Sequence, residues 1–165
     1  MTTLVIVGLP GSGKTSVAEA VAHRLERPYL DTDQLLAAAT GVSTAQFLRD
    51  VGEAEFRVRE CEVLEAAVLD DAVIATGGGI VASERARELL KRQRTIWLDC
   101  DDELLVERVH DGDRPLLTGD RRESIARLRA ERSSWYHEVS LARVDSSERL
   151  EDVVERVIQE AERAG

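Results

Sequence analysis

The chain has 165 residues, of which 43% are hydrophobic and 33% charged, and its formal net charge is −10. A globular chain of this length buries about 70% of the surface it would expose unfolded, so it can hold a full core without disulfides. The excess of 32 acidic over 22 basic residues argues against a general nucleic-acid binder and against a protein drawn to anionic lipid. Only two basic residues are lysines, Lys14 and Lys91, and we expect helix arginines such as Arg121 and Arg129 to be solvated.

The N-terminal segment contains no pattern of a leader or a membrane anchor. Its apolar run, at 4–7, stops after four residues, far short of the ~18 apolar residues of a membrane span. Cys61 and Cys100 lie outside any Cys-x-x-Cys or Cys/His cluster, so we expect two buried thiols rather than a disulfide framework or a zinc site. We therefore expect a cytoplasmic protein with no membrane contact.

Short apolar runs alternate with helical patterns along the whole chain. The apolar runs predict strands at 4–7, 29–30, 73–75, 95–98 and 141–144. Among the helical patterns, one ends before Pro28, two short ones flank Gly41, and the others cover about 54–69, 84–92, 101–110, 121–137 and 150–161. The turn-rich segment 111–120 predicts a mobile loop. This alternation predicts one α/β domain over 1–165, with a parallel sheet covered on both faces.

A phosphate-binding loop follows the first predicted strand. Residues 8–15 read GLPGSGKT, which fits G-x-x-x-x-G-K-[ST] without a mismatch. Glycines let successive backbone N–H groups turn toward a β-phosphate, and the following helix presents its positive end. Lys14 would reach the β- and γ-oxygens, and the Thr15 hydroxyl would ligate Mg²⁺. A glycine-rich turn that binds nothing is disfavoured, because the flanking strand and helix are those of a nucleotide site. The predicted ATP-binding residues of this loop are Gly11, Ser12, Gly13, Lys14, Thr15 and Ser16.

The remaining sequence narrows the class of nucleotide enzyme. GTPases with this loop normally carry an N/T-K-x-D motif, but Lys91 is followed by RQR at 92–94, so the motif is absent. The small size excludes most multidomain motors. The leading interpretation is a small-molecule kinase.

Two carboxylates follow the second predicted strand, where an open α/β sheet places ligand-binding groups. Asp31 and Asp33 are two residues apart, so on extended chain they point to opposite sides and can do different jobs. One would hold Mg²⁺ through water, and the other would orient or deprotonate an acceptor hydroxyl. The alternative is a pair of N-cap residues for the following helix.

Three further motifs could form the acceptor side of the site. Arg57 and Glu60 share one helix face, a spacing that usually means an exposed ion pair of small energetic value. The triple glycine at 77–79 either lets the backbone approach a ligand closely or forms a flexible turn. Arg114 lies in the 111–120 loop, whose closure would bring its guanidinium to a transferring phosphate.

Together these motifs resemble the shikimate kinase family, over essentially the whole chain and in the family's order. They lie at 8–15, 31–33, 56–60, 77–79, 114–117 and 131–133. The resemblance implies a nucleoside-monophosphate-kinase-like P-loop fold with a five-stranded parallel sheet in the order 2-3-1-4-5. It also implies transfer of the ATP γ-phosphate to the 3-hydroxyl of shikimate, a step of the chorismate route to aromatic amino acids.

The resemblance implies a role for each matching residue around the transferred phosphate. Thr15 would ligate the Mg²⁺ cofactor directly, and Asp31 would lie near it. Asp33 would bind the acceptor hydroxyl and act as the catalytic base. Lys14 and the lid arginine Arg114 would contact the transferring phosphate.

The other implied contacts lie at the two ends of the site, with acceptor binding at about 31–60 and the lid at about 111–120. The implied shikimate contacts, beside Asp33, are Arg57 with Glu60 orienting it, the Gly78 backbone, and Arg132. The implied ATP contacts, beside the phosphate loop, are Arg114, Arg108 stacked on adenine, and Arg149 in the adenine-binding loop at 144–150.

Two other functions remain as alternatives. A related kinase acting on another hydroxy acid, such as gluconate, would also use a carboxylate clamp, but the triple glycine together with Arg57 favours shikimate. A nucleotide-binding regulatory protein without catalysis is disfavoured, because Lys14, Asp33 and Arg114 are all present. We expect ATP and shikimate as the partners, no nucleic acid, and a monomer.

Overall fold

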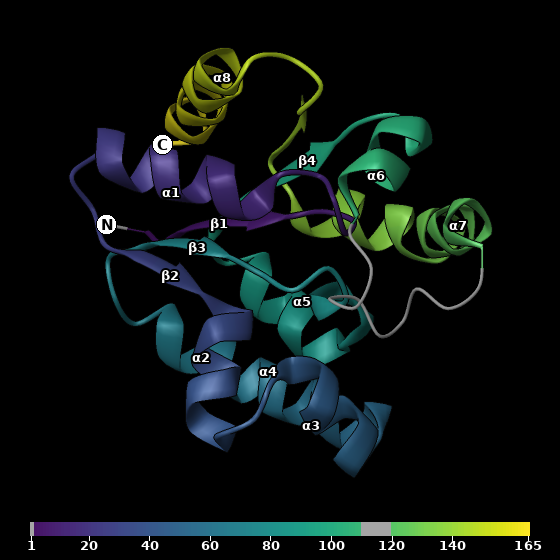
Figure 1. The fold of residues 1–165 in the computed structure, drawn as a ribbon. Helices are drawn as coiled ribbons and strands as arrows, with labels where there is room; N and C mark the ends of the chain where they lie inside the picture. Colours follow the sequence, from purple (N-terminus) through teal and green to yellow (C-terminus); the bar gives the residue numbers. More distant parts are fainter. Residues whose placement is uncertain (1, 110–119) are drawn as a thin grey trace.

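The computed structural model describes residues 2–109 and 120–165. Its centre is a five-stranded sheet in the order β2-β3-β1-β4-β5, in which each pair of neighbouring strands runs parallel (Figure 1). The strands are β1 (Leu4–Val7), β2 (Tyr29–Asp31), β3 (Val73–Ala75), β4 (Arg94–Asp99) and β5 (Ala142–Asp145). The predicted fold class and strand order are confirmed, and no strand end differs from its prediction by more than one residue.

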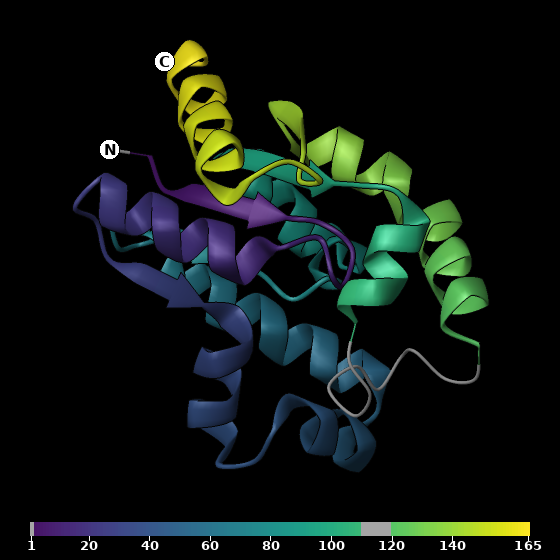
Figure 2. The same cartoon turned by 45° about the horizontal axis from the view of Figure 1, so that its top comes forward.

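Helices cover both faces of this sheet. One face carries α1 (Lys14–Arg24) and α8 (Leu150–Arg163), which lie side by side, and the other carries α4 (Glu53–Ala67), α5 (Glu84–Leu90) and α7 (Arg121–Val139) (Figures 1 and 2). The remaining helical segments are α2 (Thr32–Thr40), α3 (Thr44–Val51), α6 (Asp102–Arg108) and the short 3-10 helix η1 (Ile80–Ala82).

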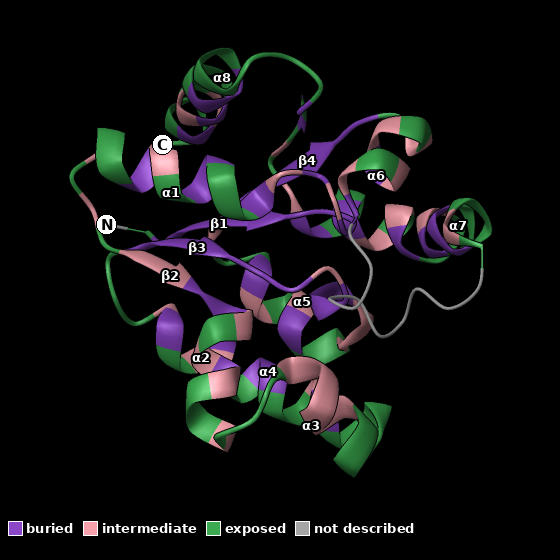
Figure 3. Cartoon of the chain, in the orientation of Figure 1, coloured by how far each residue is buried: buried purple, intermediate pink, exposed green. Residues whose placement is uncertain are grey.

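The two faces have separate cores because side chains alternate along each strand. Leu4 and Ile6 of β1 pack with the α1 and α8 side, whereas Val5 and Val7 pack with the α4, α5 and α7 side. The central strands are therefore buried along their length, as their continuous apolar runs predict (Figure 3).

Local sequence explains several helix ends. The Ser83 hydroxyl accepts the Ala86 N–H at 3.3 Å and caps the start of α5. Gly41 has φ 76° and ends α2, which separates the two short helices expected there. The helix expected over 101–110 ends earlier, at Arg108, whereas α7 continues beyond its expected end to Val139.

Both cysteines are buried free thiols, as predicted. Cys61 lies on the core-facing side of α4, and Cys100 follows β4. In the part of the chain that the structure describes, no helix is both long and apolar enough to cross a membrane.

The carboxyl ends of the parallel strands lie at one edge of the sheet, where such sheets bind their ligands (Figure 1). β1 leads into the phosphate loop, β2 into α2, and β3 into the triple glycine. Helices α2, α3 and α4 pack against one another beside this edge. The fold therefore gathers the three predicted motifs at 8–15, 31–33 and 77–79.

Candidate active site

The phosphate loop runs from the end of β1 to the start of α1. Gly11 and Gly13 have φ angles of 82° and 93°, in the left-handed region where a residue with a Cβ is strained. A Cβ on Gly11 would also come within 2.8 Å of the Leu105 carbonyl oxygen. Because Gly13 directly precedes α1, the loop brings its N–H groups and the positive helix end to one place.

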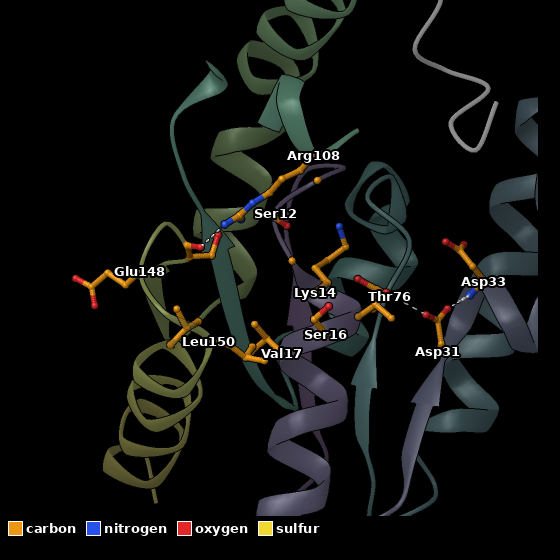
Figure 4. Close-up of a pocket in the computed structure, with 15 residues that line it drawn as sticks. Ser12, Lys14, Ser16, Val17, Asp31, Asp33, Thr76, Arg108, Glu148 and Leu150 are labelled. Carbon is orange, nitrogen blue, oxygen red and sulfur yellow. Dashed lines mark hydrogen bonds between the residues drawn. The ribbon is translucent and has the colours of Figure 1, made fainter. Parts of the chain in front are cut away.

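A cleft of about 480 Å³ opens beside this loop (Figure 4). Lys14 lies near its middle, Arg108 and Glu148 lie toward one end, and Asp31 and Asp33 lie toward the other. The residues that line it are Gly11, Ser12, Gly13, Lys14, Thr15, Ser16, Val17, Asp31, Asp33, Thr76, Arg108, Ser146, Glu148, Leu150 and Val153. One cleft therefore unites the predicted phosphate-binding set with both predicted carboxylates.

Lys14 is buried at the floor of this cleft. Its Nζ donates to the carbonyl oxygens of Gly8 at 2.8 Å and Leu9 at 3.0 Å. These bonds hold a compact ammonium inside the turn of the loop, a place less suited to the wide guanidinium fork of arginine. That constraint explains a lysine here in a chain whose other basic residues are nearly all arginines.

The Thr15 hydroxyl and the Asp31 carboxylate, two oxygen groups suited to a hard cation, lie side by side next to the phosphate loop. The hydroxyls of Thr15 and Tyr29 donate to Asp31 Oδ2 at 3.5 and 3.2 Å. Asp31 Oδ1 accepts the N–H groups of Asp33 at 2.9 Å and Gln34 at 3.2 Å, so it also caps α2. Asp31 thus combines the capping and the ligand-side interpretations that its sequence position allows.

This small donor set fits Mg²⁺, which usually takes one or two protein oxygens and completes its shell with water and substrate phosphates. Within 2–109 and 120–165, no group of three or more His, Cys, Asp or Glu side chains could hold a metal ion. Thr15 and Asp31 are the candidate pair for the ion because their oxygens lie 3.5 Å apart beside the phosphate loop.

Asp33 lies on helix α2 rather than on extended chain, because α2 already begins at Thr32. The sequence prediction assumed that Asp31 and Asp33 both lie on extended chain. That assumption is wrong, although both carboxylates line the cleft. Asp33 faces the triple glycine, since a Cβ on Gly77 would come within 2.8 Å of its Oδ1. The Gly77 N–H donates to the Thr32 hydroxyl at 3.1 Å, which holds the two segments together.

Arg57 and Glu60 form a buried ion pair, not the exposed pair that such spacing usually means. Arg57 Nη1 lies 3.2 and 3.1 Å from the two carboxylate oxygens of Glu60, whose side chain is 2% exposed. Burial raises the pKa of Glu60 to about 7 against the opposing effect of the Arg57 charge, and the nearby Asp33 charge adds to the rise. The Arg57 guanidinium also lies 5.3 Å from the centre of the Phe56 ring.

The triple glycine is a place of close approach, not a loose turn. A Cβ on Gly79 would overlap the Arg57 guanidinium. A Cβ on Gly78 would come within 3.1 Å of Pro10 Cδ in the phosphate loop. Side chains here would displace the Arg57 guanidinium or crowd Pro10, so the glycines let this segment lie close to both Arg57 and the phosphate loop.

Arg132 of α7 is buried and lies near the Glu60 carboxylate. Its charge favours the ionised form of Glu60 and acts on the Tyr136 hydroxyl as well. The Nε atoms of Arg132 and Arg57 are both buried and find no acceptor within the described chain. Buried donors without acceptors are rare, and guanidinium donors pair best with carboxylate or phosphate oxygens. This end of the site therefore suits a small anion.

At the other end of the site, Arg108 closes α6 beside the phosphate loop. Its guanidinium donates to the Ser146 carbonyl oxygen at 3.0 Å and lies 3.9 Å from Cys100 Sγ. The structure therefore brings Arg108 into the cleft, and its stacking on adenine stays a prediction.

The structure does not bring the Arg149 side chain into the cleft. This side chain is 80% exposed and lies 3.6 Å from Glu151. Arg149 is the residue just before α8, and its neighbours on either side, Glu148 and Leu150, line the cleft in its place.

Arg129 is not the solvated charge expected from its position. It donates to both carboxylate oxygens of Asp99 at 3.0 Å and to Asp102 at 2.6 Å. Asp99 is buried and also accepts from Arg143 at 2.7 Å. This cluster ties the start of α6 and the middle of α7 to the end of β4, and so steadies the two helices that carry the site arginines.

The predicted lid at 111–120, with Arg114, lies outside the described residues except for Asp120. Asp120 accepts the Arg122 N–H at 2.8 Å and caps α7. Arg121, also expected to be solvated, donates to the Val109 carbonyl oxygen at 3.0 Å. The role of Arg114 stays a prediction.

Some residues of the site are marked by none of the sequence motifs: Tyr29, Thr76 and Tyr136. Ser146 and Glu148 lie within the predicted adenine-binding loop at 144–150 but were not singled out there. Thr76 could be found because it directly follows a predicted strand, where ligand groups gather. Tyr136 could be found because it lies four residues after Arg132 on one helix. No pattern in the sequence marks the Tyr29 hydroxyl.

Comparison with known proteins gives one family. The family model for shikimate kinase matches residues 10–162. The shikimate kinase of Symbiobacterium thermophilum is 41% identical over 171 residues, covering 98% of this chain and 97% of the relative. That of Mycobacterium avium is 39% identical over 157 residues, covering 93% and 89%.

Solved structures agree with the sequence relatives. The shikimate kinase from Acinetobacter baumannii in complex with shikimate matches with a TM-score of 0.92 at 30% identity, covering 96% of this chain and 92% of that one. The Aquifex aeolicus shikimate kinase matches with 0.84 at 32% identity, covering 97% and 96%. A gluconokinase from Sinorhizobium meliloti reaches 0.61 at 15% identity, which is a likeness of fold alone.

Proposed function

The chain belongs to the shikimate kinase family and catalyses the ATP-dependent phosphorylation of shikimate, and we propose that the cleft described above is its active site. The observation that carries this proposal is a pair of arginines, Arg57 and Arg132, whose buried Nε donors find no acceptor within the described chain. They do not line the cleft itself, but both act on Glu60, next to Asp33 at the cleft's end. We propose further that the acceptor group is the 3-hydroxyl.

In this proposal the shikimate carboxylate lies between the guanidinium groups of Arg57 and Arg132. Planar forks that are always charged hold a carboxylate in a fixed orientation, which a lysine could not do as well. Glu60 orients Arg57 through its two carboxylate oxygens. Gly78 supplies a backbone contact, which its lack of a side chain makes accessible.

We propose Asp33 as the base. It lines the cleft next to Gly77, between the phosphate loop and the acceptor end, so a hydroxyl of an acceptor held there would lie near it. Asp33 takes the hydroxyl proton while the hydroxyl oxygen bonds to the γ-phosphorus. The bond from the γ-phosphorus to the β–γ bridging oxygen then breaks, and ADP leaves. Lys14 and the loop N–H groups stabilise the charge on the phosphates.

Mg²⁺ would be held by the Thr15 hydroxyl directly and by Asp31 through water, since these oxygens lie together at the mouth of the loop. When bound with ATP, the ion neutralises charge on the β- and γ-phosphates. Tyr29 and the α2 backbone hold the Asp31 carboxylate in place. Arg114 is proposed to contact the transferring phosphate.

We also propose a single-domain monomer that acts in the cytoplasm, with acceptor binding at about 31–60 and a lid at about 111–120.

The experiment that tests this function is ADP release measured by a coupled assay with shikimate and, separately, with gluconate. We expect shikimate-dependent release and none with gluconate. Folded enzyme that releases no ADP with shikimate would overturn the function, and release with gluconate alone would assign the site to another hydroxy acid.

A further inference from the structure

Tyr136 has no part in the chemistry proposed so far, yet its hydroxyl lies among the residues proposed to bind the acceptor. The side chain is fully buried in the second half of α7. Its hydroxyl donates to the Gly78 carbonyl oxygen at 2.5 Å. The Arg132 guanidinium, one turn earlier on the helix, is a charged neighbour that lowers the pKa of the same hydroxyl against the larger effect of burial.

The position of this hydroxyl is set by the core. The Tyr136 ring stacks on Trp97 of β4, with ring centres 5.7 Å apart and planes at 25°. Burial raises the pKa of Tyr136 to about 12, so the hydroxyl stays protonated and able to donate at neutral pH. A rigid aromatic ring on a central strand thus holds one donor toward the triple glycine.

The hydrogen bond from the Tyr136 hydroxyl fixes the peptide between Gly78 and Gly79, two residues that have no side chains to hold it in place. In a planar trans peptide, the Gly78 carbonyl and the Gly79 N–H point in opposite directions, so holding one directs the other. Gly79 is buried, and within 2–109 and 120–165 nothing accepts its N–H. A buried N–H normally finds an acceptor, which here would come from a ligand.

Gly78 is also held from its other side. Pro10 of the phosphate loop packs against it, so its peptide lies between that loop and α7. The Tyr136 hydroxyl therefore joins the phosphate loop, through Gly78, to the helix that carries Arg132. Loss of this hydroxyl would leave the Gly78 carbonyl without its donor and would free Arg132 from one neighbour.

We propose that Tyr136 is a positioning residue for the acceptor, whose hydroxyl holds the Gly78 peptide and the Arg132 guanidinium in the arrangement that receives the shikimate carboxylate. This inference rests on the proposed function, because it concerns the contacts of that same site. Tyr136 itself does not touch the reacting atoms. Its influence falls on acceptor binding, since the hydrogen bonds described above for Lys14 and Thr15 run to Gly8, Leu9 and Asp31.

The test is Tyr136→Phe, which removes the hydroxyl and keeps the ring and its stack on Trp97. We expect KM for shikimate, and Kd for shikimate measured alone by calorimetry, to rise about tenfold. KM and Kd for ATP should stay within about twofold of wild type. A purely structural hydrogen bond would instead lower stability and leave the affinity for shikimate unchanged.

Thr95→Val is the matched control. The Thr95 hydroxyl is also buried and donates to a backbone carbonyl, that of Leu90 at 2.8 Å, but at the start of β4 and outside the cleft. Both variants should lose comparable stability in urea, and only Tyr136→Phe should weaken shikimate binding. Unchanged shikimate constants in both variants would overturn the positioning role.

A double-mutant cycle separates the two contacts of the hydroxyl. Combined with Arg132→Lys, Tyr136→Phe should cause less additional loss of shikimate affinity than it does alone, because part of its effect passes through Arg132. Fully additive losses would overturn that link. Wild-type enzyme is measured first: if it neither binds nor phosphorylates shikimate, the proposed function fails. If it does both and Tyr136→Phe matches it, only the positioning role fails.

Discussion

Glu60 should make the protein less stable as the pH rises through neutrality. Its carboxylate is buried, and burial raises its pKa from 4.5 to about 7 in the folded protein. The folded state therefore binds this proton more tightly than the unfolded chain does. The resulting stabilisation is complete below pH 4.5 and is lost as the pH rises through 7. At about 1.4 kcal/mol per pH unit, the whole loss is about 3 kcal/mol, of which about 2 kcal/mol falls between pH 5 and 8.

Glu60→Gln removes this titration and nearly preserves the shape of the side chain. We expect the free energy of unfolding of the variant, minus that of wild type, to increase by about 2 kcal/mol from pH 5 to pH 8 in urea denaturation. Any pH-independent effect of the substitution on the Arg57 contact is the same at both pH values, so it cancels from the change. Glu62→Gln, an exposed position on the same helix, measures the effect of losing one negative charge. A Glu60→Gln difference that stays constant with pH, once that control is subtracted, would refute the reasoning.

Three further predictions concern the site and its supports. Arg132→Ala should raise KM for shikimate about 100-fold and KM for ATP less than threefold, because its unpaired donor lies at the acceptor end; equal rises in steady-state assays would contradict this placement. Asp33→Asn should lower kcat at least about 100-fold while calorimetry still detects ATP binding, and turnover within a few-fold of wild type would remove Asp33 as the base. Asp99→Asn should lower the free energy of unfolding by about 2 kcal/mol, because it removes the charge of a buried carboxylate that Arg129 and Arg143 contact; an unchanged urea midpoint would mean that the cluster contributes nothing to stability.

The strands were predictable from sequence because a parallel strand covered on both faces must be apolar along its length. The ends of the strands were less predictable from sequence, because strand pairing continues into polar residues. In β4, Arg94 pairs with Leu4 of β1, and Asp99 pairs with Asp145 of β5, so the strand exceeds its apolar run at each end. The phosphate loop was predictable for another reason: its glycines are required by local backbone angles, which do not depend on the rest of the fold.

Burial of charged pairs was not predictable from spacing. Arg57 and Glu60 are three residues apart on α4 and lie buried, whereas Arg59 and Glu62 have the same spacing on the same helix and are both about half exposed. Only the segments that pack over each pair distinguish them. The triple glycine covers Arg57, and nothing in the spacing of α4 records that contact.

The other differences between the sequence predictions and the structure arise from contacts between distant parts of the chain. The Tyr136 hydroxyl meets Gly78 across 58 positions of sequence, and Arg129 meets Asp99 across 30. Such pairs arise when helices dock on the sheet, and no local pattern records them. The position of Asp33 depends instead on whether α2 begins before or after it, a choice made by the Asp31 cap.

The central claim is that Arg57 and Arg132 hold the carboxylate of the acceptor beside this cleft. Its most direct test compares kcat/KM for shikimate with kcat/KM for shikimate methyl ester, which keeps every hydroxyl and loses the charge. Charge-assisted pairing with Arg57 and Arg132 predicts a value at least about 100-fold lower for the ester. Values within a few-fold of each other would contradict the claim.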